Sequence, residues 1–158
     1  MIDAQTSIED VLPLELIDVS MKATSREEVL EAFADMFEQA GCLSDRAQFL
    51  KDAWWREGEG PTGIGDGIAI PHSKSEGVSK TSLAVARIPE AVEWPSLDDG
   101  PCRAFVMFAV RSDDQNQEVH LLSKVAVALC HKEVVETLLT SDDPKTIRCA
   151  LSGEESNE

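Results

Sequence analysis

One histidine of this sequence, His72, stands where it could act as a nucleophile. It follows a short apolar run that ends in Pro71, and three glycines precede that run within residues 63–67. An imidazole is a nucleophile near neutral pH, proline fixes the backbone that leads into it, and the N–H groups of a glycine-rich turn suit an anion such as phosphate. We therefore predict that His72 is presented to a phosphoryl group rather than buried.

The glycine-rich segment matches neither of two common nucleotide-binding motifs. No Gly-Lys-Ser/Thr follows it, as a P-loop requires, and its glycines are spaced by two rather than as Gly-x-Gly-x-x-Gly. On the residues alone, a second interpretation of His72 therefore stays open. In that interpretation it is an ordinary hydrogen-bonded side chain after a strand.

Three nearby side chains could bind the oxygens of a phosphoryl group. Arg56 offers a guanidinium, which suits phosphate, although a basic residue there could equally complement the C-terminus of a helix. Thr62 and Ser73 offer hydroxyl donors, and either could instead cap a turn. A phosphohistidine relay also needs a partner for the second ring nitrogen, but it needs no metal and no nucleotide cofactor.

Residues 56–72 resemble the phospho-acceptor signature of enzyme IIA of the bacterial phosphoenolpyruvate-dependent sugar phosphotransferase system, fructose/mannitol type, which includes a nitrogen-regulatory branch. The similarity continues in order through residues 83–87, 92–94 and 105–110, and it covers most of the chain, from about residue 16 to residue 150. The resemblance implies an α/β fold in which His72 is the phospho-acceptor and Arg56 binds the phosphoryl group.

The resemblance also implies partners. A IIA protein of this type accepts phosphate from the histidine carrier HPr and passes it to a IIB domain, whose membrane partner imports a sugar. One alternative is a protein of the nitrogen-regulatory kind, whose phosphorylation state controls other proteins. Another is a regulatory scaffold that is no longer phosphorylated. Neighbouring genes would separate transport from regulation, and a phosphorylation assay would identify a scaffold.

The sequence departs from the family at a second histidine, which usually opens the pattern His-Leu-x-x-Leu-Ser-x-Leu. Alignment on Leu122-Ser123 without a gap places Glu118, and not His120, at the histidine position. Residue 120 points about 200° away from residue 118 on a helix. We therefore predict that Glu118 lies toward His72 and raises its pKa. If the helix begins in another register, His120 takes that place.

The composition restricts the class of protein. A net charge of −16, from 30 acidic and 14 basic residues, argues against nucleic-acid or anionic-membrane binding. It suits either docking onto a basic partner or a generally soluble, salt-adapted surface. The four cysteines fit neither a Cys-x-x-Cys pair nor a zinc site and indicate reduced packing residues. Without a signal peptide or a membrane-length apolar run, we expect a cytoplasmic protein with no direct membrane insertion.

Helix and strand signals alternate along the chain. Ser25 begins a capping box for a helix that Gly41 ends, and Ser44 caps a second helix with Arg56 in its last turn. Strands are expected near residues 16–20, 67–70, 82–88 and 104–110, and helices over 118–130, 131–139 and from 143 onward. The order predicts one α/β domain, residues 1–152, with helices on both sides of a mixed β-sheet and an acidic mobile tail, residues 153–158.

Overall fold

The structure, a computed structural model, describes residues 7–152. A mixed six-stranded sheet lies at its centre, in the order β1-β5-β6-β3-β2, with β4 also paired to β6. β5 and β6 run antiparallel, as do β2 and β3. β1 is parallel to β5, and β3 and β4 are parallel to β6. The strands are β1 (Ile17–Asp18), β2 (Gly63–Gly65), β3 (Ile68–Ala69), β4 (His72–Ser75), β5 (Ser82–Val92) and β6 (Cys102–Arg111).

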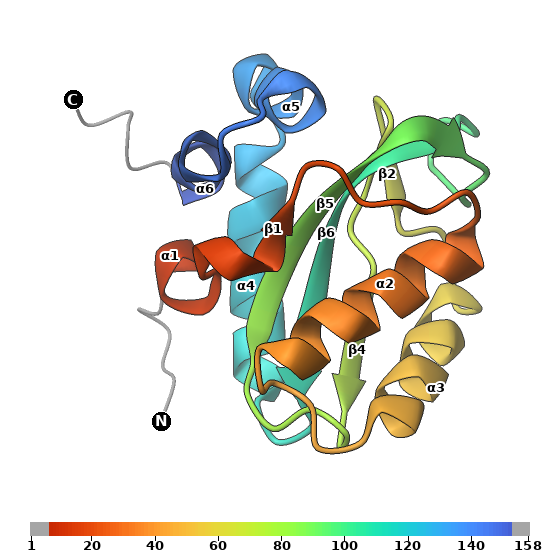
Figure 1. Ribbon diagram of the computed structural model, residues 1–158, viewed down its shortest axis with the longest axis vertical. Helices are drawn as coiled ribbons and strands as arrows, with labels where there is room; N and C mark the ends of the chain where they lie inside the picture. The colour runs from red at the N-terminus through yellow and green to blue at the C-terminus, as the bar shows by residue number, and fades with distance from the viewer. Residues whose placement is uncertain (1–6, 153–158) are drawn as a thin grey trace.

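Helices cover both faces of this sheet (Figure 1). The helices are α1 (Ile8–Val11), the 3₁₀ helix η1 (Leu14–Leu16), α2 (Arg26–Gln39), α3 (Arg46–Glu57), α4 (Gln115–Ala128), α5 (Lys132–Thr140) and α6 (Pro144–Ser152). α2 and α3 lie on one side, while α4 lies on the other together with α1, α5 and α6. This arrangement confirms the predicted single α/β domain. The predicted tail, residues 153–158, lies outside the described residues.

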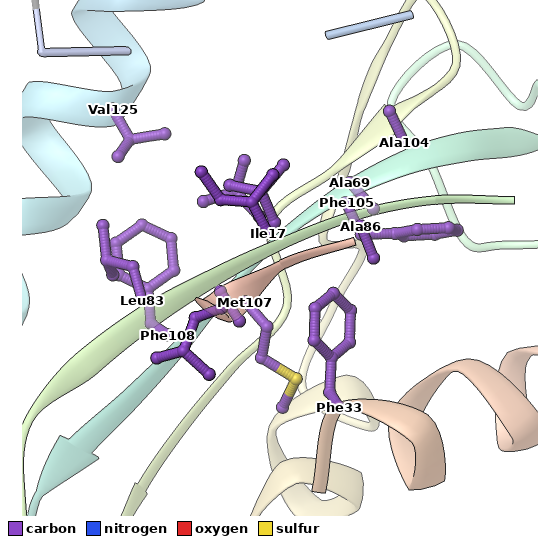
Figure 2. Packing of buried hydrophobic residues seen from close by; sticks show 14 of the residues in the cluster. Ile17, Phe33, Ala69, Leu83, Ala86, Ala104, Phe105, Met107, Phe108 and Val125 are labelled. Carbon is purple, nitrogen blue, oxygen red and sulfur yellow. The ribbon is translucent and has the colours of Figure 1, made fainter. Parts of the chain in front are cut away.

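The core lies on both faces of β6, which is buried along almost its whole length. On one face, Phe105 packs edge-on against Phe33 of α2, with ring centroids 6.5 Å apart. On the other face, Val125 of α4 lies over Leu83 and Phe108, a cross-strand pair (Figure 2). The predicted central apolar strand is therefore confirmed, because alternate side chains of one strand fill two layers of core.

The caps of the first two long helices are partly as predicted. Ser25 caps α2, and its hydroxyl accepts a hydrogen bond from the N–H of Glu28. The Glu28 carboxylate, however, accepts from the backbone and hydroxyl of Thr24 rather than completing a capping box. Asp45, and not Ser44, caps α3, because its carboxylate is the group that reaches the N–H of Gln48.

The strand expected over residues 67–70 is β3, and it is continued after a break by β4, a strand that the sequence analysis did not predict. Both strands pair with β6 in parallel, as Ile68 with Ala104 and His72 with Phe108. The break falls at residues 70–71, because proline has no N–H to donate to the ladder. A tight turn with positive φ at residues 65–67 joins β2 to β3.

Other boundaries moved by a few residues. β1 is only two residues long, since the apolar stretch before it forms α1 and η1. α4 begins at Gln115, three residues earlier than expected. Cys42 and Cys102 are buried as predicted, and burial raises the pKa of the Cys102 thiol to about 12. Cys149 is only partly buried, and the prediction of a packing residue is wrong for Cys130, which is exposed. Across residues 7–152, no helix has both the length and the apolar character needed to cross a membrane.

Candidate active site

His72 is the first residue of β4 and lies in a cavity of about 540 Å³. Its ring packs edge-on against Phe108, its partner in the β-ladder, with ring centroids 6.2 Å apart. Only 8% of the residue is exposed, so the expectation of an exposed histidine is wrong. The ring is reached from the cavity. The other residues that line this cavity are Asp52, Trp55, Arg56, Lys74, Glu118 and Leu122.

Two hydrogen bonds define the protonation of the His72 ring. Nδ1 lies 3.2 Å from the carbonyl oxygen of Ile70, which can only accept, so Nδ1 carries the ring proton. Nε2 lies 2.9 Å from Nε of Arg56, which can only donate, so Nε2 presents its lone pair. The arrangement selects the neutral tautomer whose nucleophilic nitrogen is Nε2.

The electrostatics of the cavity keep this ring neutral. Burial lowers the pKa of His72, and the positive charge of Arg56 lowers it further. The hydrogen bond to Ile70 and the charge of Glu118 act in the opposite direction but do not outweigh burial. Glu118 therefore acts in the predicted direction, but the net shift of the His72 pKa is downward, because desolvation of the imidazolium is the larger effect.

Arg56 reaches His72 from the last turn of α3. Besides its bond to Nε2, it donates through a terminal nitrogen to the carbonyl of Gly60, at 3.3 Å. The helix therefore delivers the guanidinium to the ring, and the loop after the helix fixes its orientation. A guanidinium placed against a neutral imidazole nitrogen can bind an anion that becomes attached to that nitrogen.

α4 brings Glu118, and not His120, into the cavity. Glu118 and Leu122 line it, one helical turn apart, whereas His120 does not. The Glu118 carboxylate lies 3.8 Å from the ammonium of Lys74. This is the side of the helix that the gapless match predicted for residue 118. Glu118 and Leu122 share this side because they are four residues apart on one helix. The earlier start of α4 therefore does not change which side Glu118 occupies.

Thr62 and Ser73 are not brought to the cavity. The Ser73 hydroxyl points to the opposite face of β4 and donates to the carbonyl of Phe49. The Thr62 hydroxyl is buried, donates to the Glu57 carboxylate and accepts from the indole of Trp94, each at 2.8 Å. Both hydroxyls are thus engaged in the core. Thr62 acts on the site only through its neighbours, by tying the glycine-rich segment to the end of α3.

Three contributors to the site were missed. Lys74 would have been found if residues 72–75 had been interpreted as a strand, because alternate residues share a face.

Glu57 is a buried carboxylate whose Oε1 lies 3.3 Å from Nη1 of Arg26, and burial raises the pKa of this carboxylate. Trp55, 66% exposed, stands at the rim of the cavity. The sequence carried no local signal for Glu57 or Trp55.

The fold and the sequence both agree with one class of protein, the IIA proteins of phosphotransferase systems. A solved structure described as the nitrogen regulatory protein IIA-Ntr from Neisseria meningitidis superposes with a TM-score of 0.83 at 29% identity. The superposition covers 91% of this chain and 98% of that one.

Sequence comparison identifies the family. Residues 10–153 match the family model for the phosphoenolpyruvate-dependent sugar phosphotransferase system, EIIA 2, and the chain belongs to this family. It is 34% identical to the fructose-specific EIIA component of Haloferax volcanii, over 93% of this chain and 96% of the relative. It is 29% identical to the fructose-specific EIIABC component of Bacillus subtilis, over 89% of this chain and only 22% of that protein. The protein is thus an EIIA-type phosphoryl carrier.

Proposed function

We propose that the chain carries the phosphoryl group on Nε2 of His72, accepting it from an HPr-like carrier and passing it to a IIB domain. The observation that supports this most strongly is the pair of hydrogen bonds to the ring, in which Nδ1–H is directed to the Ile70 carbonyl and the Nε2 lone pair to the Nε–H of Arg56. A buried, neutral imidazole with one fixed tautomer is ready to act as a nucleophile near pH 7.

Within the chain, the proposed transfer uses two groups that are already in contact, Nε2 of His72 and Nε of Arg56. The Nε2 lone pair attacks the phosphorus, and the bond from phosphorus to the donor's imidazole breaks, leaving its electron pair on the donor ring. Nδ1 keeps its proton throughout. The Nε–H of Arg56, which bonds to Nε2 before transfer, turns to a phosphoryl oxygen, where a charge-assisted bond is stronger. Transfer to the next partner reverses these steps.

Similarity supports the choice of partners. The Bacillus subtilis relative is an EIIABC component, which is consistent with transfer from an A component to a B component. Fructose is the sugar named for both that protein and the Haloferax volcanii relative. We therefore propose a fructose-type phosphotransfer chain, with the cytoplasm as the place where HPr, this protein and IIB meet.

The likeness to IIA-Ntr favours a second candidate function, in which the phosphorylation state of His72 regulates other proteins. The two functions share the same acceptor and differ in the recipient. Incubation of the phosphorylated protein with a fructose-type IIB domain distinguishes them, because a transport component loses its label to IIB and a purely regulatory protein keeps it.

The acceptor itself is tested by labelling with phosphoenolpyruvate, enzyme I and HPr. We expect one acid-labile phosphoryl group per chain, and none in His72→Gln, which keeps a polar side chain of similar length. An unphosphorylated wild-type chain would support the scaffold interpretation, and undiminished labelling of the variant would exclude His72.

A further inference from the structure

Lys74 is a second positive side chain in the cavity of His72. Because β4 is a strand, residues 72 and 74 point to the same face of the sheet, and both line the cavity. About one third of the Lys74 side chain is exposed. Its ammonium can therefore move within the cavity while its aliphatic stem stays packed.

Lys74 is paired only loosely with Glu118. Nζ and Oε1 are 3.8 Å apart, which is within the range of charge attraction but too long for a hydrogen bond. Partly exposed pairs of this kind contribute little to stability. Glu118 thus holds the lysine without binding it tightly, and a stronger acceptor could take its place.

The charges of the cavity require such an exchange when a phosphoryl group arrives. The charged side chains known to line it are Arg56, Lys74, Asp52 and Glu118, two of each sign. With a neutral His72 these charges cancel. A phosphoryl group brings about two negative charges on its oxygens, and the ring, which keeps its Nδ1 proton, becomes positive, so the site gains a net charge of about −1. If Lys74 stayed with Glu118, Arg56 alone would face the new charge beside two carboxylates.

We propose that Lys74 is a phosphoryl ligand, held by Glu118 before transfer, that exchanges this carboxylate for a phosphoryl oxygen once the group is on His72. The proposal rests on the proposed function of His72. No additional covalent step is involved, since the ammonium keeps its protons and forms a charge-assisted hydrogen bond. Glu118, left without its cation near a dianion, destabilises the phosphorylated form and favours onward transfer.

A double-mutant cycle tests the exchange. Wild type, Lys74→Met, Glu118→Gln and the double variant are compared in the initial rate of labelling from phosphorylated HPr and in the half-life of the phosphorylated form. We expect Lys74→Met to slow labelling about tenfold in both backgrounds, and Glu118→Gln to lengthen the half-life about threefold or more. If Lys74→Met has no effect in the Glu118→Gln background, the lysine only neutralises Glu118 and the proposal is overturned.

Three controls keep the result specific. Lys124→Met changes the net charge equally at a lysine of α4 that lines a different cavity, and it should label as wild type. Lys74→Arg keeps the positive charge and should label at most of the wild-type rate. This result would show that the slow labelling of Lys74→Met comes from the lost charge. If His72→Gln is still labelled, the proposed function fails. If labelling depends on His72 while Lys74→Met equals wild type in both backgrounds, only the role of Lys74 fails.

Discussion

Arg56 donates its Nε–H to Nε2 of His72 over 2.9 Å, and the arginine thereby covers the lone pair that attacks phosphorus in the proposed mechanism. The same contact keeps the ring unprotonated at that nitrogen and places a guanidinium where phosphoryl oxygens would lie. Because the incoming group must replace this bond, Arg56 is expected to act both before and during transfer.

Replacement of Arg56 by glutamine should slow phosphoryl transfer about a hundredfold, since one charged donor is lost from the site. It should also raise the pKa of His72, because the charge of Arg56 lowers that pKa. Transfer rates and NMR titration of the imidazole measure the two effects. Normal transfer together with a lower melting temperature would show that Arg56 serves the C-terminus of α3 instead.

The free energy of unfolding should depend on the charge of His72. Burial lowers its folded-state pKa below the ordinary value of 6.5, so the unfolded chain takes up a proton first as the pH falls. The contribution of the neutral ring to the free energy of unfolding is therefore fully present above pH 6.5. It is lost as the pH falls from 6.5 through the lower pKa that His72 has in the folded protein. Urea unfolding between pH 5 and 8 should show this loss in wild type and less of it in His72→Gln. Parallel pH curves for the two proteins would contradict the shift.

Thr62→Val should destabilise the fold by roughly 1–3 kcal/mol, because it leaves the Glu57 carboxylate and the Trp94 indole without their shared partner. Thr62→Ser keeps the hydroxyl and is the matched control. We expect serine to restore both stability and transfer, as measured by urea unfolding and labelling. If Thr62→Val slows transfer without any change in stability, the hydroxyl acts on the phosphoryl group directly.

Trp55→Ala should weaken binding of the phosphoryl donor about tenfold or more, since an exposed tryptophan beside a reaction site is typical of a binding hot spot. The melting temperature should change little. Val127→Ala is the matched control, because Val127 is 61% exposed on α4 and lines another cavity. Equal affinities of HPr for all three proteins, measured by calorimetry, would place the docking surface elsewhere.

The sequence predicted the elements whose signals are local. The Ser25 cap, the glycine after α2 and the apolar run of β6 each define their own segment. β4 could not be predicted in this way, because its sequence, His-Ser-Lys-Ser, is short and polar. It is a strand because β6 offers it a parallel partner, and that pairing joins residues far apart in the chain.

The candidate site was predictable where a periodicity or a motif pointed to a side chain. Helical spacing placed Glu118 on the cavity side, and the glycine-rich signature singled out His72. The burial of His72 was not predictable, because side chains from α3 and α4 cover it. The positions of Thr62 and Ser73 depend in the same way on partners in distant elements, Trp94 and Phe49.

The proline break between β3 and β4 has a consequence for regiochemistry. The Ile70 carbonyl, next to Pro71, accepts from Nδ1 and would exclude that nitrogen from the proposed phosphoryl transfer. The product would be a single isomer, τ-phosphohistidine, and not a mixture with the π form. The two isomers differ in hydrolytic lifetime and in ³¹P coupling to the ring protons. In the proposed mechanism, a backbone oxygen rather than a side chain would thus decide which nitrogen–phosphorus bond stores the energy.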